Sequence, residues 1–482
     1  MHEEKEVQQS TDFGSQFSIF AFLMACGILF HQSILSDWNP FSHHMVASLT
    51  AIIVLTRPKS LVAFLVMVGA HLASVLIDLP YVVNHWIFVG VMDIAILLTA
   101  LGLWLQHRCS RLTGGELLQV LAPVIRWSVI VMYTFAALAK LNSDFFKPEL
   151  SAAVSLYSGL SEKLGGILPQ EMWAFYLVIW GTAALECSLP ILLTVRKTRW
   201  LGITLAFSFH FAMGVSGFIP FSGFAVAFLF LFLPEDVPAR FTELRVSMPW
   251  LDKACSAIAR VFRNPATPIT LCLVWFLIAC TRSYAWLPPA QVRMAVIRVG
   301  QLLFALYYGG VAFFVWKMYG RTLFDPSDKP QPASLKLASV GLAIVPLVVI
   351  LNALCPYIGL KTESSFTMYS NLQTEGNQWN HLLMPKAMKV FHWQDDLVSI
   401  IDSSYPPFQH AAKEDIRLTW FEFQRQASEA DSIAVTYRRG DAVYEVSDSK
   451  SDPVLSHPPE AYWGKWMWFR EVPLPEKNTI RH

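Results

Sequence analysis

Long apolar runs recur along the first three quarters of the chain and give way to a polar last quarter. Most are long enough, or nearly so, to cross the ~30 Å hydrocarbon core of a bilayer as an α-helix. The second, seventh and eighth runs are short and fit tilted pairs or partly re-entrant segments. The pattern predicts helices at 17–35, 43–56, 60–78, 81–106, 117–140, 172–195, 200–216, 218–234, 268–286, 293–317 and 334–354.

Basic residues cluster in the connections that follow the even-numbered runs. The other connections contain little lysine or arginine, or balance it with acids. By the positive-inside rule, this predicts a cytoplasmic N-terminus and an extracytoplasmic C-terminus. The turn at 78–85 and the end of the fifth helix then lie at the same, extracytoplasmic face. The clusters are Arg57 with Lys59, Arg108 with Arg111, residues 196–199, residues 240–263, and Lys317 with Arg321.

The polar segment 355–482 has the size of a small domain. Two runs in 432–446 alternate apolar and polar residues about Gly440 and Asp441, which predicts a β-hairpin. The segment 416–427 fits either another strand or a short helix. The Arg-Gly-Asp triplet at 439–441 is interpreted as turn chemistry and not as an adhesion motif.

The predicted fold class is therefore mainly α, a polytopic transmembrane bundle of about 9–11 spans with a small C-terminal extracytoplasmic domain containing β-structure. A cytoplasmic tail (1–16) precedes the transmembrane core (17–240). A cytoplasmic linker with an inserted helical pair (241–333) leads to the last transmembrane helix (334–354). The extracytoplasmic α+β domain (355–482) completes the chain.

Composition supports a membrane protein. Hydrophobic residues make up 54% of the chain and charged residues 15%, against roughly 25% charged in soluble proteins. A net charge of +1 argues against a nucleic-acid partner. The N-terminus lacks the basic region and cleavage site of a signal peptide, so the first run is expected to remain as an anchor. No metal site is predicted, because the His43-His44 pair has no third ligand at zinc spacing.

Ionisable residues inside membrane spans are costly and are therefore functional candidates. His71, Asp93, Glu186 and His210 lie within predicted helices. For each of them a satisfied hydrogen bond between helices is the simpler explanation.

Lys140 ends the fifth helix in the segment "YTFAALAKLNSDFF". It could extend to the lipid headgroups, as lysines near helix ends often do. It could also be a base for a lipid-soluble acid. Asn84 and His85 begin the fourth helix at the same predicted face, where they could cap that helix or line a site with Lys140.

Several segments resemble vitamin K-dependent gamma-glutamyl carboxylases and the bacterial members of that superfamily, which share the HTTM domain. The likeness covers roughly residues 15–245 well and 334–446 loosely. The segments, in the family's order, are "YVVNHWIFVG", "YTFAALAKLNSDFF", "LECSLPILLTVRKTRWLG" and "FSFHFAMGVSGFIPFSGF".

The resemblance implies that Lys140 is the catalytic base that deprotonates reduced vitamin K or another lipid hydroquinone. Asn84, His85 and His210 match residues lining that site, and Glu186 stands where the family has an aspartate. In the family, oxygen converts the deprotonated hydroquinone into a strongly basic alkoxide. The alkoxide removes a γ-proton from a peptide glutamate, and the carbanion captures carbon dioxide. The implied partners are membrane lipids and an exported polypeptide, and the implied location is a bacterial inner membrane.

The chain also departs from the family's eukaryotic enzymes. Ala139 stands in place of a second lysine, Asn142 in place of an aspartate and Phe145 in place of a tryptophan. The extracytoplasmic part is much shorter, and 362–385 replaces much of it as a cover of the site or a structural lid. Two hypotheses follow, a quinone-linked membrane enzyme and a non-catalytic scaffold that serves in lipid binding, export or assembly.

Overall fold

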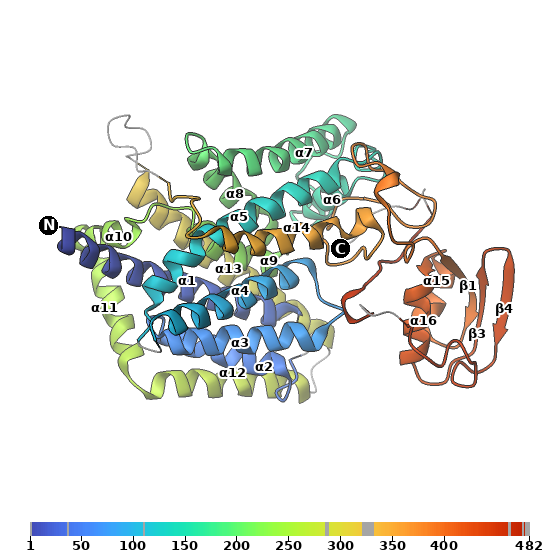
Figure 1. The fold of residues 1–482 in the computed structure, drawn as a ribbon, viewed down its shortest axis with the longest axis horizontal. Coiled ribbons are helices and arrows are strands. Elements are labelled where there is room, and N and C mark those ends of the chain that lie inside the picture. Colours follow the sequence, from blue (N-terminus) through green and yellow to red (C-terminus); the bar gives the residue numbers. More distant parts are fainter. Residues whose placement is uncertain are drawn as a thin grey trace. The chain divides into compact units, whose positions relative to one another are not determined.

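A computed structural model describes most of the chain. It covers residues 2–35, 38–108, 111–284, 289–320, 332–460, 464–474 and 477. Each apolar run predicted as a helix is helical over most of its described length (Figure 1). The helices are α1 (His2–Leu35), α2 (His43–Thr56), α3 (Leu61–Asp78), α4 (Asn84–Gln106), α5 (Gly114–Lys140), α7 (Met172–Thr194), α8 (Arg199–Val215), α9 (Ile219–Phe230), α12 (Ala266–Tyr284), α13 (Pro289–Tyr319) and α14 (Ile344–Ile358).

Seven helices in the described chain are long and apolar enough to cross a membrane, namely α1, α3, α4, α5, α7, α13 and α14 with the turn before it. An eighth span results if α12 is counted together with the preceding α11 (Pro249–Arg263), which it meets at 84°. The three runs predicted to be short are α2, α8 and α9, with 14, 17 and 12 residues. The predicted fold class, a mainly helical membrane protein with a small β-region, is confirmed.

The last span begins later than the apolar pattern suggests. It was expected from residue 334, but regular helix starts with a 3-10 turn (Val340–Ala343) that leads into α14. The carbonyl groups of Ser334 and Leu335 accept hydrogen bonds from the side chains of Arg126 and Trp127. These contacts hold 332–338 outside the helix, although its composition is apolar enough to continue it.

Three helices lie in connections for which no helix was predicted. They are α6 (Ala152–Lys163) in the connection after Lys140, and α10 (Val237–Ser247) and α11 in the basic linker. The basic cluster at 196–199 also differs from expectation. Arg199 is buried and donates to the carbonyls of Leu193 and Thr194 at the end of α7, at 2.6 and 2.7 Å. Its charge therefore stabilises a helix C-terminus. Arg321 of the last cluster lies outside the described residues.

Contacts divide the chain into two units whose segments alternate along the sequence. Unit 1 comprises Met1–Ile77, Val89–Ile130 and Ile191–Pro346, and unit 2 comprises Asp78–Phe88, Val131–Pro190 and Leu347–His482. In unit 1, α9 packs against α1 and α8, and it is buried at every position except Phe221. A helix that is apolar on all sides belongs in a core. Gly27 of α1 permits the close approach of α9, because a Cβ at Gly27 would lie 2.7 Å from the ring of Phe224 in α9.

Unit 2 contains the last turns of α5, the helices α6, α7 and α14, and the polar C-terminal region. Phe145, Ala153, Val154, Ile179 and Ala183 form a buried cluster that joins α6 to α7. This contact places the connection after Lys140 against the helix that carries Glu186.

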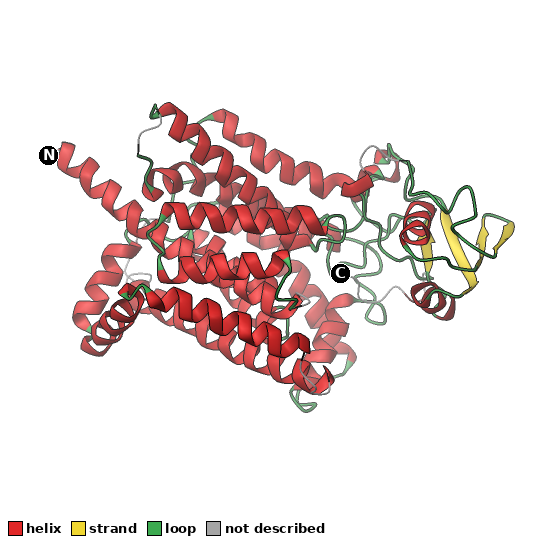
Figure 2. Ribbon diagram, turned by 90° about the horizontal axis from the view of Figure 1, so that it is seen from below, coloured by secondary structure: helices red, strands yellow, loops and turns green. Residues whose placement is uncertain are grey.

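The C-terminal region of unit 2 contains a four-stranded antiparallel sheet of order β2-β1-β3-β4 (Figure 2). Helices α15 (Pro406–Lys413) and α16 (Trp420–Glu429) contribute Phe408 and Phe423 to its core. The predicted hairpin is confirmed, with Gly440 at φ +58° in its turn. The segment expected to be a strand or a helix is both, β2 followed by α16. The strands are β1 (Leu397–Ser403), β2 (Arg417–Thr419), β3 (Val435–Arg439) and β4 (Ala442–Val446).

Candidate functional site

Lys140 is the last residue of α5, and its amine forms an ion pair with the carboxylate of Glu186 in α7. The distance between Nζ and Oε2 is 2.8 Å. Both residues are buried, with 6% of their surface exposed. A lysine that extends to the headgroups keeps its amine in water. The buried pair therefore does not fit that interpretation, and it places a charged acid–base pair inside unit 2.

A polar segment, residues 362–385, binds the chain directly after Lys140; we call it the cover segment. The backbone N–H of Leu382 donates to the carbonyl of Leu141 at 2.9 Å, and that of Ser143 donates to the carbonyl of Asn380 at 3.0 Å. Between these two bonds, Asn142 pairs with His381 in an isolated β-bridge. The cover segment is thus joined to the end of α5 in the manner of a short antiparallel sheet.

Asn142 is the central residue of this junction. Its Nδ2 donates to the carbonyl of Ala139 at 2.8 Å and also to that of Ser370 in the cover segment. Its Oδ1 accepts from the backbone N–H groups of Asp144 and Phe145, at 3.1 and 2.9 Å. The amide supplies both donors and an acceptor, which a carboxylate at this position could not do.

Asn84 binds the same cover segment from the start of α4. Its Oδ1 accepts a hydrogen bond from the backbone N–H of Phe366, and the carbonyl of Val82 accepts one from the Ser364 hydroxyl. Asn84 therefore holds the cover segment and does not cap its own helix. His85 follows it and is 8% exposed. The sequence predicts that the 78–85 turn and the end of α5 lie at the same face. In the structure, both bind the cover segment.

Within the cover segment, polar side chains are buried and strongly bonded. Arg470 and Glu375 form a buried bidentate ion pair, at 2.5 and 2.9 Å. Asn371 accepts from the first backbone N–H of α6, at Ala152, and donates to the carbonyl of Leu150. Asn371 thereby caps α6 from a distant part of the chain.

The backbone of the cover segment is strained at four non-glycine residues. Ser364, Phe366, Tyr369 and Asn371 have φ values between +52° and +61°. Such conformations cost on the order of 1–3 kcal/mol each and persist only where the surrounding structure holds them. The bonds from Asn84, Asn142 and α6 supply that support.

An apolar cluster lies next to Lys140. Ala139, Tyr357 and Leu372 are buried together, and Phe135 and Met384 pack against them. The hydroxyl of Tyr357 is buried and has no hydrogen-bond partner among the described residues. A buried polar atom of this kind calls for an explanation, such as a bound water or ligand.

His381 fixes the cover segment above this cluster. Its Nδ1 accepts from the backbone N–H groups of Leu383 and Met384, at 3.0 and 2.9 Å, and its Nε2 donates to the carbonyl of Leu138 at 2.9 Å. This pattern requires the neutral tautomer that carries its proton on Nε2. Burial lowers the pKa of His381, which favours the same neutral form, although the bond to Leu138 opposes that shift.

The remaining predicted residues belong to unit 1. His210 is fully buried in α8, and its ring meets that of Phe221 edge to face at a centroid distance of 4.9 Å. His71 and Asp93 are bonded to each other between α3 and α4, with both side chains buried. The simpler explanation, a satisfied bond between helices, therefore applies to His71 and Asp93.

Several residues that build the site could not be predicted from the sequence. Asn371, Glu375 and Arg470 lie in polar stretches without periodicity, and only their partners distinguish them from surface residues. Lys361 is similar, since it is 1% exposed and lies over the Trp466 ring at 4.7 Å. Burial lowers the pKa of Lys361 to about 8.

Comparison with protein families finds a match for the part of the chain that ends shortly after α9. Residues 10–236 match the family model of the HTTM domain. The matched region contains Asn84, His85, Lys140, Glu186 and His210, whereas the cover segment lies beyond its last residue. No curated protein and no solved structure matches the chain.

Proposed function

We propose that this multi-pass membrane protein is an enzyme in which the Lys140–Glu186 pair exchanges protons with a lipid-soluble hydroquinone, such as reduced vitamin K. The chemistry would carboxylate or otherwise modify an exported polypeptide at the extracytoplasmic face. The buried ion pair beneath a bonded polar cover is the observation that carries the proposal. The resemblance of the HTTM domain to the gamma-carboxylase superfamily supports the choice of a quinol.

The lining of the site suits a quinol ring. The cluster of Ala139, Tyr357 and Leu372 offers an apolar surface beside the charged pair, and the Tyr357 hydroxyl offers a hydrogen bond to a ring oxygen. A bound hydroquinone would supply an acidic hydroxyl proton and reducing electrons, with molecular oxygen as the oxidant that accepts them. The cover segment would keep water away, as a strongly basic reaction step requires.

The pair itself determines where a proton can go. As an ammonium and a carboxylate, Lys140 and Glu186 are neutral together, and the carboxylate can accept one more proton. The ammonium then remains and stabilises a negative charge formed nearby. In this proposal, Glu186 is the proton acceptor and Lys140 is its electrostatic partner. Asn84 positions the cover segment, and His85 is retained as a lining residue because the family resemblance implies that role.

The location follows from the same proposal. The N-terminus would lie in the cytoplasm and the C-terminal domain outside, in a bacterial inner membrane. This orientation rests on the basic connections that follow the even-numbered apolar runs of the sequence. The polypeptide substrate would then approach from the side of the C-terminal domain, and the hydroquinone would arrive from the membrane.

The test is mass spectrometry of quinones that co-purify with the chain in native-lipid particles. We expect the wild type to retain a quinone. We expect Lys140→Ala and Glu186→Gln each to lose at least ten times as much bound quinone as a control variant loses. The control is Lys147→Ala, since Lys147 pairs with Asp144 but its side chain is 49% exposed.

A non-catalytic scaffold, or a protein for lipid binding or export, is the alternative. The hydrogen bonds of the cover segment would stabilise such a protein equally well. It predicts that no quinone co-purifies and that Lys140→Ala changes stability alone. Absence of quinone from correctly folded wild type would therefore favour the scaffold.

A further inference from the structure

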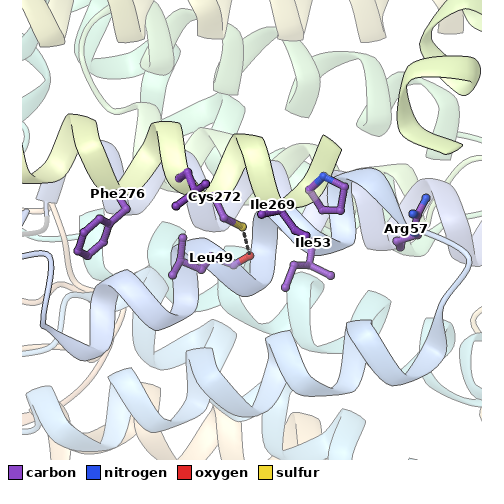
Figure 3. Close-up of a pocket in the computed structure, with 8 residues that line it drawn as sticks. Leu49, Ile53, Arg57, Ile269, Cys272 and Phe276 are labelled. Carbon is purple, nitrogen blue, oxygen red and sulfur yellow. Dashed lines mark hydrogen bonds between the residues drawn. The ribbon is translucent and has the colours of Figure 1, made fainter. Parts of the chain in front are cut away.

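An apolar groove runs between α2 and α12 in unit 1 (Figure 3). Its volume is about 470 Å³, within the range of ligand-binding pockets. Figure 3 shows Phe276 at one end of the row of lining residues and Arg57 at the other. The groove is thus apolar along its length and cationic at one end. Its lining residues are Leu49, Ile53, Arg57, Pro268, Ile269, Cys272, Leu273 and Phe276.

The cationic end of the groove is larger than Arg57 alone. Nη1 of Arg57 donates to the backbone carbonyl of Phe262, in the last turn of α11. That turn also carries Arg260 and Arg263, which are both exposed. The bond therefore holds a turn with two further guanidinium groups next to Arg57.

The helices that form this junction supply no opposing charge. Residues 38–77 and 253–284 contain no aspartate or glutamate. The one acidic residue of α11, Asp252, lies in its first turn and pairs with Arg245 of α10 at 2.7 Å. An external anion is therefore the natural partner of the cationic end.

Helix α11 has the character of a helix that lies in a membrane interface. Trp250, Ile258 and Val261 share one face and are 56, 54 and 55% exposed, while Ser256 and Arg263 lie on the opposite face. Helix α12 has 19 residues and is about 28 Å long, which matches the hydrocarbon core. With α12 crossing the membrane, the 84° bend places α11 close to the membrane plane, as its two faces require.

We propose that the junction of α2, α11 and α12 is a binding site for one anionic phospholipid. Its acyl chain occupies the groove, and its phosphate contacts Arg57 and the basic last turn of α11. The groove opens where lipid chains already are, because α11 and α12 place its cationic end at headgroup depth. A free phosphate would make no use of the groove, and a neutral amphiphile would leave the cations without a partner.

Native mass spectrometry of the detergent-solubilised full chain tests the charge requirement. Phosphatidylglycerol and phosphatidylcholine with the same acyl chains are added at equal concentration. We expect phosphatidylglycerol to bind at least about fivefold more tightly, and Arg57→Gln or Arg260→Gln to weaken it about fivefold, since each basic residue near an anionic headgroup contributes a factor of this size. Arg196→Gln, the same charge change at an exposed residue in the turn after α7, is the control and leaves binding unchanged.

A second pair of variants tests the groove. Ile269→Trp fills it, whereas Leu277→Trp adds the same volume to α12 at a residue that does not line it; the two wild-type side chains are 62 and 61% exposed. We expect lipid binding to fall at least fivefold in the first variant only. Equal binding of the two lipids, unchanged binding in Ile269→Trp, or displacement of the lipid by inorganic phosphate would each overturn the proposal.

Discussion

Removing one partner of the Lys140–Glu186 pair should be far more damaging than removing both. Lys140→Met or Glu186→Leu leaves the other charge buried, and breaking a buried pair in this way costs about 3–5 kcal/mol. The side chains are only 7 and 8% exposed, so solvent screens little of that cost. Replacement of both by apolar residues is often neutral or stabilising, and we expect the double variant to recover at least about 2 kcal/mol relative to either single variant.

Unfolding in detergent micelles, followed by the fluorescence of the chain's 17 tryptophans, measures these differences. Lys147→Met is the control, because the Lys147–Asp144 pair has one exposed partner, and such a pair contributes about 1 kcal/mol or less. Two results would refute the reasoning. Single variants within about 1 kcal/mol of the wild type would mean that the charges are hydrated. A double variant that is destabilised by the sum of the single effects would mean that the two residues do not interact.

Three further variants test other parts of unit 2. Burial lowers the pKa of Lys361 to about 8 in the folded chain, whereas the ordinary pKa of a lysine is about 10.4. Between these two pH values the unfolded chain binds more protons than the folded chain, so the free energy of unfolding rises with pH across that window. Lys361→Met should abolish this rise in pH-dependent unfolding and stabilise the chain at pH 7 by up to about 3 kcal/mol. Asn371→Ala should cost about 1–3 kcal/mol, because it leaves the buried N–H at the start of α6 and the carbonyl of Leu150 without partners; unchanged protection of α6 in hydrogen exchange would contradict this. Thr419→Ala removes the side chain that caps α16 and should cost about 1 kcal/mol in thermal unfolding, with Thr419→Ser close to the wild type.

The helices could be predicted because their signal is local. In lipid, an apolar segment must pair its backbone N–H and C=O groups with each other, and only a helix does so within one segment. The exceptions are places where a side chain from a distant part of the sequence forms a hydrogen bond with a backbone group. Arg126 and Trp127 bind the carbonyls of Ser334 and Leu335, and the start of α14 moves accordingly. Composition alone carries no trace of such a contact.

The site could be predicted only in part, for a similar reason. Lys140 and Glu186 stand out because charges are rare within apolar runs, and a charge there suggests a partner. The sequence did not indicate that each is the partner of the other. The cover segment carries no such contrast, because its polar residues look like those of an exposed loop. Their burial follows from bonds to Asn84, Asn142 and Arg470, which lie far away in sequence.

The pair also changes what a lysine-to-arginine substitution reveals. If Lys140 alone were the base, Lys140→Arg would be inactive, because a guanidinium remains protonated at any relevant pH. If Glu186 accepts the proton and Lys140 stabilises the anion that remains, an arginine can do the second task, and Glu186→Gln is the inactive variant. Quinol oxidation by these two variants, compared at equal folded protein, assigns the proton to one side chain. Activity in Glu186→Gln together with none in Lys140→Arg would return the base to the lysine.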